Sequence, residues 1–209
     1  MARWTRIEAG LRQRHGPLLA GMDEVGRGPL AGPVVACALV MPPGVRAIAG
    51  VDDSKALDAA TRERLARRIR HSALAIGIGA ASVREIDRLN ILHATVLAMQ
   101  RALATLTREL DQAPHHVIVD GSPLRWLGVP HTAVVKGDAR CYSVACASIV
   151  AKVLRDQLMR RLAARHDGYA WERNAGYGTV AHRQAIVERG LTAHHRRSFC
   201  LSLQTTLPL

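Results

Sequence analysis

The sequence has few aromatic residues and no pattern that marks secretion, a membrane span or a cysteine-based metal site. Aromatic residues make up 3% of the 209 residues, so aliphatic side chains must build the core. The four cysteines form no CxxC pair and no apolar signal segment precedes them, so we expect reduced thiols in a cytoplasmic protein. No run of about 18 apolar residues occurs, which argues against a membrane span.

Lysine is also scarce, although the chain is strongly basic. Of the 29 basic residues only Lys55, Lys136 and Lys152 are lysines, and the formal net charge is +12. Such a balance predicts attraction to polyanions, with nucleic acid as the first choice and an anionic membrane as the second. Where arginine is so strongly favoured, a lysine indicates a place that needs a compact ammonium group, unless chance placed it there.

Length and hydrophobic patterning predict one globular domain built on a sheet. Hydrophobic residues make up 48% and charged residues 22% of the chain. The patterning predicts strands at 17–23, 33–41, 73–82, 116–120 and 132–136, and helices at 58–72, 83–110, 143–165 and 179–189, with a possible break at Asn90. Short connections predict antiparallel pairing of the first three strands, and helical crossovers predict parallel pairing of the later ones. The expected class is therefore α/β or α+β, with a mixed sheet flanked by helices.

Four carboxylates lie at predicted strand ends, each close to a glycine. Asp23 and Glu24 end the first strand, Asp120 ends the fourth, and Asp138 follows the fifth. Hard divalent cations such as Mg²⁺ and Mn²⁺ prefer oxygen ligands, and glycine lets a phosphate approach the backbone. The pattern favours a metal-dependent phosphoryl-transfer site; the alternative is that each carboxylate is an ordinary solvated strand end.

Seven segments resemble ribonuclease HII, in the same order over residues 17 to 200. They are GMDEVGRGPLAGPVVA (21–36), DDSKAL (52–57), LNILHATVLAM (89–99), VDG (119–121), KGDARCYSVACASIVAKVLRD (136–156), GYGT (176–179) and HRRSF (195–199). The resemblance implies an α/β, ribonuclease H-like fold with a mixed five-stranded sheet flanked by helices and a small C-terminal helical extension. It also implies an N-terminal segment at 1–16, a catalytic domain at 17–165 and the extension at 166–209.

The resemblance assigns both catalysis and metal binding to Asp23, Glu24, Asp120 and Asp138. It implies hydrolysis of RNA in RNA-DNA hybrids, and of single ribonucleotides embedded in duplex DNA. The cut would fall 5′ of the ribonucleotide and leave 3′-hydroxyl and 5′-phosphate ends. Two Mg²⁺ or Mn²⁺ ions would act with the substrate bound. The expected partners are these duplexes, not a membrane, and the expected state is a monomer.

Recognition of a single ribonucleotide requires a contact to its 2′-hydroxyl. The resemblance assigns that contact to Gly26, Arg27 and Gly28 through the backbone, and assigns packing on the adjoining sugar to Tyr177. The alternative for Tyr177 is an ordinary loop tyrosine. We expect Lys55, Lys136, Lys152 and Ser148 to contact phosphates. Ser148 is equally well explained as a small helix residue, and Lys152 lies one helical turn before Asp156, which predicts an ion pair.

Two other functions fit parts of the pattern. Another ribonuclease H-like nuclease, such as a junction-resolving enzyme, would also use carboxylates and metal ions, since a fold does not fix a function. A non-catalytic module that binds duplexes would explain the net charge but not the four carboxylates. The adjacent histidine pairs, His115 with His116 and His194 with His195, are predicted to lie on the surface.

Overall fold

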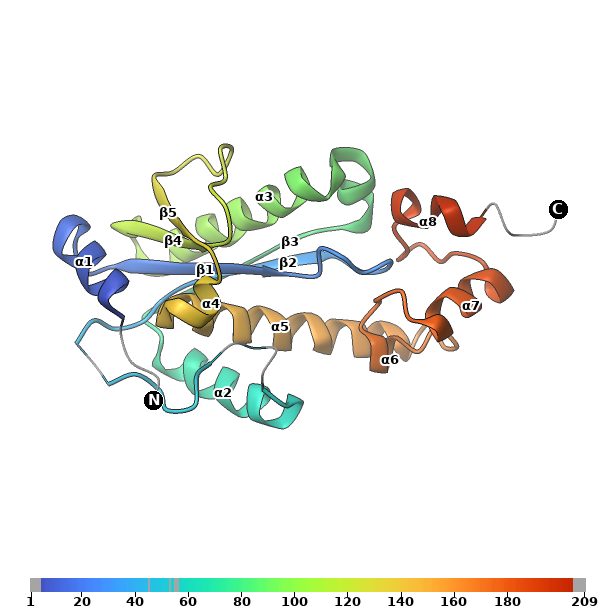
Figure 1. Cartoon of the computed structure of the whole chain (residues 1–209), viewed down its shortest axis with the longest axis horizontal. Helices are drawn as coiled ribbons and strands as arrows, with labels where there is room; N and C mark the ends of the chain where they lie inside the picture. Colours follow the sequence, from blue (N-terminus) through green and yellow to red (C-terminus); the bar gives the residue numbers. More distant parts are fainter. Residues whose placement is uncertain (1–4, 45, 53, 55–56, 205–209) are drawn as a thin grey trace.

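A five-stranded sheet organises the chain in the computed structural model, which describes residues 5–44, 46–52, 54 and 57–204 (Figure 1). The strands lie in the order β3-β2-β1-β4-β5. Their bounds are β1 Leu19–Val25, β2 Val34–Val40, β3 Ala75–Ala81, β4 His116–Asp120 and β5 His131–Val134. The helices are α1 Arg6–His15, α2 Ala59–Ser72, α3 Val83–Leu110, α4 Gly137–Arg140, α5 Tyr142–Ala163, α6 Trp171–Asn174, α7 Val180–Arg189 and α8 Arg197–Gln204.

The sheet is mixed, as the sequence predicted. β1 pairs antiparallel with β2 on one side and parallel with β4 on the other. β2 and β3 are antiparallel, and β4 and β5 are parallel. β1 therefore lies at the centre of the sheet, with both of its edges paired to apolar strands.

Helices cover both faces of the sheet. Figure 1 shows α3 along one face, and α5 with α2 beyond it along the other. Glycines in β3 let α3 approach closely, because a Cβ at Gly77 or Gly79 would clash with the backbone of α3. Gly21 of β1 leaves the same kind of space for Ser143 at the start of α5. The predicted break at Asn90 is confirmed, since that residue has a φ of 66° and its side chain caps the following turn of α3.

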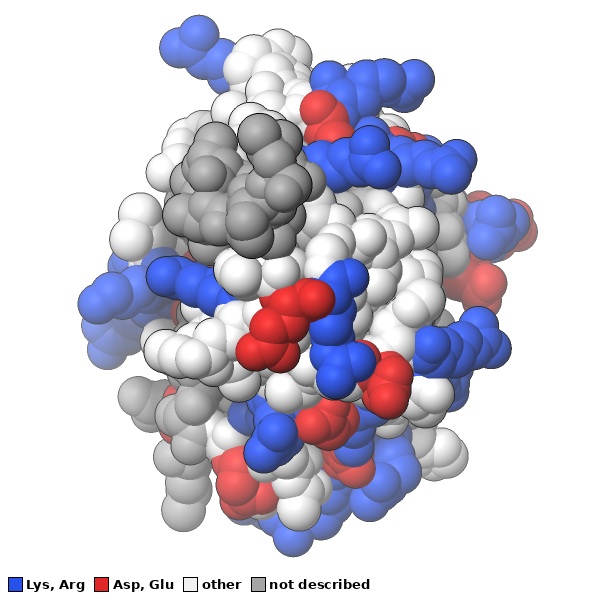
Figure 2. All heavy atoms as spheres, turned by 90° about the vertical axis from the view of Figure 1, so that its right-hand side faces the viewer, with Lys and Arg blue, Asp and Glu red and all other residues white. Residues whose placement is uncertain are grey.

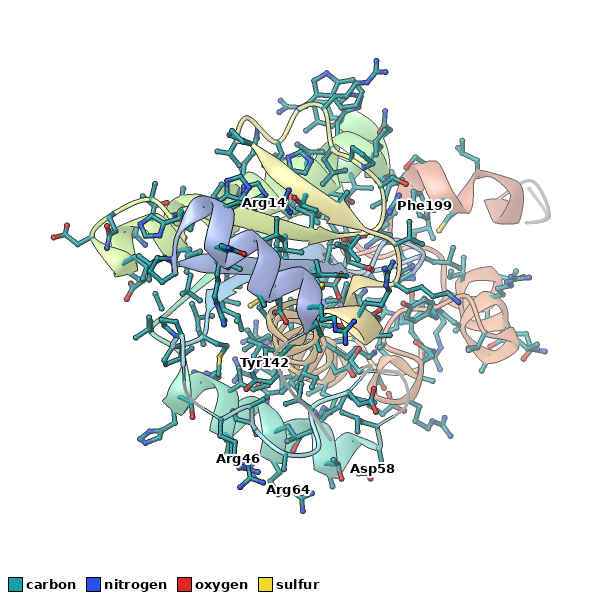
Figure 3. All side chains as sticks on the ribbon, turned by 60° about the vertical axis from the view of Figure 1, so that its left-hand side comes forward. Arg14, Arg46, Asp58, Arg64, Tyr142 and Phe199 are labelled. Carbon is teal, nitrogen blue, oxygen red and sulfur yellow. The ribbon has the colours of Figure 1, made fainter. Side chains whose placement is uncertain are left out.

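Helix α1 is the main element that the sequence analysis did not predict. Thr5 and Glu8 form a capping box at its start, so the helix is stabilised locally. The buried Glu8 carboxylate also accepts the backbone amides of Tyr142 and Ser143, at 3.1 and 2.8 Å, and the Ser143 hydroxyl at 2.8 Å. One carboxylate therefore caps two helices and joins α1 to α5. Figure 3 shows α1 in front of α5, with Tyr142 below it.

The C-terminal helices surround a third, smaller core cluster. Tyr169, Trp171 and Ile186 pack there with Met159, which belongs to α5.

Two predictions fail in this part of the chain. No helix was predicted between residues 165 and 179, and this stretch contains the short helix α6. His195 is 2% exposed rather than on the surface, because it packs against the rings of this cluster. His116 is also buried, since it stacks on His15 of α1 at 4.0 Å. Whether a domain boundary lies at residue 165 stays a prediction.

Two expectations about the whole chain can be compared with the described residues. All four cysteines are free thiols, and all are buried. Within residues 5–44, 46–52, 54 and 57–204, no helix has both the length and the apolar character needed to cross a membrane.

Replacing Glu8 by alanine should destabilise the protein by about 3 kcal/mol, because two buried amides of α5 would lose their acceptor. Urea unfolding followed by circular dichroism measures this loss. The matched control is Glu109→Ala, which removes an exposed carboxylate from α3 and should change stability by less than about 0.5 kcal/mol. Equal stability of the two variants would contradict the capping role of Glu8.

Candidate active site

Asp23 and Asp120 come together because two parallel strands end side by side. In the ladder between β1 and β4, Met22 is opposite Val119, so Asp23 and Asp120 occupy the next matched positions. Met22 and Val119 point into the core beneath α3. Side chains alternate along a strand, so the two carboxylates point toward the other face, which α5 covers.

Burial and mutual repulsion shape the charge of these carboxylates. Burial, with the nearby charges of Glu24 and Asp120, raises the pKa of Asp23 well above its ordinary value. Burial also raises the pKa of Glu24, although its ion pair with Arg27 at 3.2 Å acts in the opposite direction. It is therefore unfavourable for several of these carboxylates to be ionised at once, and a bound cation would offset their repulsion.

Ser148 lies beside Asp23 at this end of the sheet. It is 6% exposed, its hydrogen bond to Asp23 lowers the pKa of that carboxyl, and its hydroxyl is 3.0 Å from that of Ser54. α5 presents Ser148 to the strand end because the first half of this helix has small side chains that pack close to the sheet. The partner of Ser148 in the structure is a carboxylate, and the expected phosphate contact stays a prediction.

A short connection fixes Asp138 near the end of β4. Asp120 accepts the backbone amide of Gly137 at 2.5 Å, and Asp138 accepts that of Ala139 at 2.9 Å. Lys136 reverses the chain before them with a left-handed φ of 56°. Asp138 is 7% exposed and lies in the first turn of α4, whereas Asp23, Glu24 and Asp120 lie at the ends of β1 and β4.

The four carboxylates supply the right donor chemistry for a divalent cation. Hard cations prefer carboxylate oxygens, and burial together with the like charges of Glu24 and Asp120 raises the pKa of Asp23, a condition that a cation would relieve. In the part of the chain that the structure describes, however, no three His, Cys, Asp or Glu side chains have the arrangement of a metal site. The residues fit a hard cation chemically, and their side chains must adjust to bind one.

Arg196 holds the Gly26-Arg27-Gly28 segment from the far end of the chain. This arginine is fully buried, and its guanidinium donates to the carbonyls of Gly26, Arg27 and Gly32 at 2.5 to 3.0 Å. Burial lowers the pKa of Arg196 to about 9. Carbonyl oxygens, rather than a carboxylate, therefore satisfy this buried charge.

Arg155 supports the same loop from α5. It is also fully buried, and it donates to the carbonyls of Ala31, Pro33 and Ala175 at 2.9 to 3.1 Å. Gly26 has a φ of 91°, and a Cβ there would collide with the Arg155 side chain. The glycine is thus required by its conformation and by the space that the arginine takes.

Tyr177 lies against this loop. Gly176 accepts the amides of Leu30 and Ala31, at 2.8 and 3.3 Å, which ties the two loops together. A Cβ at Gly28 would lie 3.8 Å from Cε1 of Tyr177, so the ring is next to the glycine. The ring is 42% exposed and remains accessible to a ligand. Sequence segments 150 residues apart therefore form one surface beside Glu24.

The predicted phosphate contacts of the lysines stay predictions, and two buried arginines that support the site were not predicted. Lys152 forms an ion pair with Asp156 at 2.8 Å, as the helical spacing predicted. Lys136 is exposed, and Lys55 lies outside the described residues. Arg155 and Arg196 were missed as supports of the site, because no sequence pattern distinguishes a buried arginine from the many exposed ones.

Figure 2 shows the end of the molecule that carries α7 and α8, with basic side chains along much of its outline. Acidic side chains lie among them rather than apart. The charge available to a polyanion at this end is therefore spread over many arginines, and no single residue accounts for it.

The family model described as Ribonuclease HII matches residues 20–202. The chain belongs to the ribonuclease HII family. It is 54% identical to the Ribonuclease HII of Granulibacter bethesdensis over 93% of this chain and 89% of that one. It is 52% identical to that of Thermosynechococcus vestitus over 88% and 85%. Relatives with this name make the chain an endoribonuclease of the ribonuclease H type.

Solved structures support the fold. The ribonuclease H2 of Pyrococcus horikoshii OT3 superposes with a TM-score of 0.70, at 24% identity, over 90% of this chain and 98% of that one. Bst-RNase HIII, solved in complex with Mn²⁺, gives a TM-score of 0.63 at 22% identity, over 85% and 65%. The predicted ribonuclease H-like fold is confirmed.

Replacing Arg196 by methionine should destabilise the protein by about 3 kcal/mol, because three buried carbonyls would lose a charged donor. Thermal unfolding measures the loss. The neighbouring Arg197→Met provides the control, since that side chain is exposed and the backbone is unchanged. If both variants unfolded at the same temperature, the guanidinium would not hold the loop.

Proposed function

We propose that the chain hydrolyses the phosphodiester bond 5′ of ribonucleotides, both in RNA-DNA hybrids and at single ribonucleotides embedded in duplex DNA. The products would carry 3′-hydroxyl and 5′-phosphate ends. The observation that carries this proposal is the continuity of the site. Glu24 lies next to the last residue of β1, and Gly26 begins the loop that meets Tyr177, so catalytic and recognition groups share one segment.

Asp23, Glu24, Asp120 and Asp138 would hold two Mg²⁺ or Mn²⁺ ions when the substrate is bound. The ions would supply an activated water and stabilise the leaving oxygen. The protein contributes by fixing the carboxylates: Gly137 orients Asp120 through its amide. The structural neighbour Bst-RNase HIII was solved in complex with Mn²⁺, which supports the use of a divalent cation.

The loop of Gly26, Arg27 and Gly28 would recognise the 2′-hydroxyl by close backbone contact. The Gly26 and Arg27 carbonyls already accept from Arg196, which fixes their direction. Gly28 is exposed and has no Cβ, so a sugar can approach it. Tyr177 would pack on the adjoining sugar. Ribose is thereby distinguished from deoxyribose by shape as well as by hydrogen bonding.

Binding would begin with the charge of the whole protein. A net charge of +12 attracts a duplex and makes its affinity fall steeply with salt. Lys55, Lys136 and Lys152 would add phosphate contacts near the cut. The enzyme would work as a monomer in the cytoplasm, where buried free thiols stay reduced.

A DNA duplex with one internal ribonucleotide tests the reaction. With Mg²⁺ or Mn²⁺ the enzyme should nick immediately 5′ of the ribonucleotide and leave all-DNA duplex intact. Asp120→Asn should lower the rate by on the order of 10³-fold, because a charged group at the reaction centre is lost. Labelled fragments resolved on a gel give the position and the rate of the cut.

Asp111→Asn is the matched control. Asp111 is an exposed carboxylate at the end of α3 with a left-handed φ, which asparagine tolerates, so full activity is expected. Binding without any cut would favour the non-catalytic duplex-binding module. Cutting of the all-DNA duplex would favour a junction-resolving type of nuclease.

Tyr177→Ala should lower kcat on the single-ribonucleotide duplex by about 10- to 100-fold, because the sugar would lose its packing surface. Tyr177→Phe keeps the ring and should lie between this variant and the wild type. Steady-state kinetics on the same duplex measure both. Wild-type kcat in Tyr177→Ala would exclude the ring from recognition.

A further inference from the structure

Two buried histidines and a buried tryptophan lie behind Tyr177. His182 is 0%, His195 2% and Trp171 0% exposed. Trp171 donates from Nε1 to Nε2 of His182 at 2.9 Å, and His195 Nε2 is 3.1 Å from the same atom. Nδ1 of His182 lies 2.9 Å from the Tyr177 carbonyl oxygen. The series of contacts therefore ends on the backbone carbonyl of Tyr177.

The partners determine which ring nitrogens carry hydrogen. The indole of Trp171 can only donate, so Nε2 of His182 is an acceptor and its hydrogen is on Nδ1. That hydrogen points at the Tyr177 carbonyl, which can only accept. The Thr192 amide donates to Nδ1 of His195 at 2.9 Å, so the hydrogen of His195 is on Nε2 and is donated to His182. Trp171 and His195 therefore share the one lone pair of His182 Nε2.

We infer that His182 and His195 are positioning residues. Together they fix the tautomer of His182, whose hydrogen bond holds Tyr177 beside the Gly26-Arg27-Gly28 segment. The inference rests on the proposed function for its effect on substrate choice, but not for the contacts themselves. Tyr177 accepts a second hydrogen bond from the Thr179 amide at 2.8 Å, so His182 completes the turn that orients the ring.

Both histidines must be neutral for this arrangement. A proton added to His182 would face Trp171 and His195, which are already donors, and one added to His195 would face the Thr192 amide. The titratable or charged groups near His195 are His166, Tyr169, His182 and His194, with Arg84, Asp87, Arg88 and Arg197 lining the adjoining cleft. The Asp87 carboxylate accepts the amides of Arg197 and Ser198. Burial lowers the pKa of His195 to about 4, and the adjacent His182 ring acts in the same direction.

Nitrogen-15 spectra of the wild-type histidine rings test the assignment directly, without a variant or an activity. At pH 7.5 we expect hydrogen on Nδ1 of His182 and on Nε2 of His195. The opposite tautomer of either ring, or a charged ring, would overturn the inference.

Two substitutions at His182 separate its two hydrogen bonds. Asparagine places an amide nitrogen near Nδ1, so His182→Asn keeps the donor to Tyr177 but loses the acceptor for Trp171 and His195. Glutamine reaches the position of Nε2, so His182→Gln keeps that acceptor and loses the donor. We expect His182→Asn to be the less stable variant and His182→Gln to have the less ordered loop.

Amide hydrogen exchange measures loop order independently of activity. Exchange at Thr179, which donates to Tyr177, should speed up by about tenfold or more in His182→Gln and stay near the wild-type rate in His182→Asn. On the single-ribonucleotide duplex, His182→Gln should lower kcat by on the order of 10- to 100-fold with little change in KM. Exchange or kcat that follows melting temperature across the two variants would show a merely structural role and overturn the inference.

His71→Gln, an exposed histidine on α2, is the control and should match the wild type in every measurement. If the wild type failed to cut this duplex, the proposed function would be wrong. The ring spectra and the exchange rates would still decide whether the histidines position Tyr177.

Acid pH gives a further test of the neutral state of His195. The unfolded residue binds a proton near its ordinary pKa of 6.5, and the folded one near about 4. Between these values the unfolded chain binds more protons, so stability should fall as the pH is lowered from about 6.5 to 4. In His195→Gln the melting temperature should fall less over this window; an equal fall would contradict a neutral, buried His195.

Discussion

Two buried guanidinium groups hold together the loops on which substrate recognition would depend. Arg155 and Arg196 donate to backbone carbonyls of residues 26–33 and of Ala175. A planar guanidinium can satisfy several carbonyls at fixed angles, which an ammonium cannot do. A loop rich in glycine gains a defined shape in this way without giving up the open backbone that a sugar needs.

At the strand ends next to this loop, buried carboxylates lie close together, although the protein as a whole has an excess of positive charge. Burial and mutual repulsion of these carboxylates cost stability, and the ion pair of Glu24 with Arg27 offsets part of that cost. Such a site lowers the stability of the folded protein, because its negative charges repel one another. A bound cation would offset that repulsion and allow a phosphate to approach. The loop held by the arginines directly follows the carboxylates of β1. A rigid backbone and repelling charges therefore lie within a few residues of each other.

The sequence predicted the sheet and the four carboxylates because both depend on local patterns: apolar runs that end in an acidic residue beside glycine. It also predicted the kink at Asn90, which one residue determines. It did not predict α1, whose buried residues are the charged Glu8 and a single leucine, Leu11. Nor did it predict the buried state of His195 or Arg196, because His195 packs against residues of other helices and Arg196 binds the distant Gly26. Tertiary contacts of polar side chains leave no periodic signal.

The contact between Arg196 and Gly26 joins residues 170 positions apart. Strand β1 is made early, but its loop gains its donors only after residue 196 has emerged from the ribosome. Contacts of such long sequence separation form late in folding. A nascent chain therefore carries its acidic residues without a formed recognition surface, and the ability to select a ribonucleotide is acquired in one of the last steps of folding.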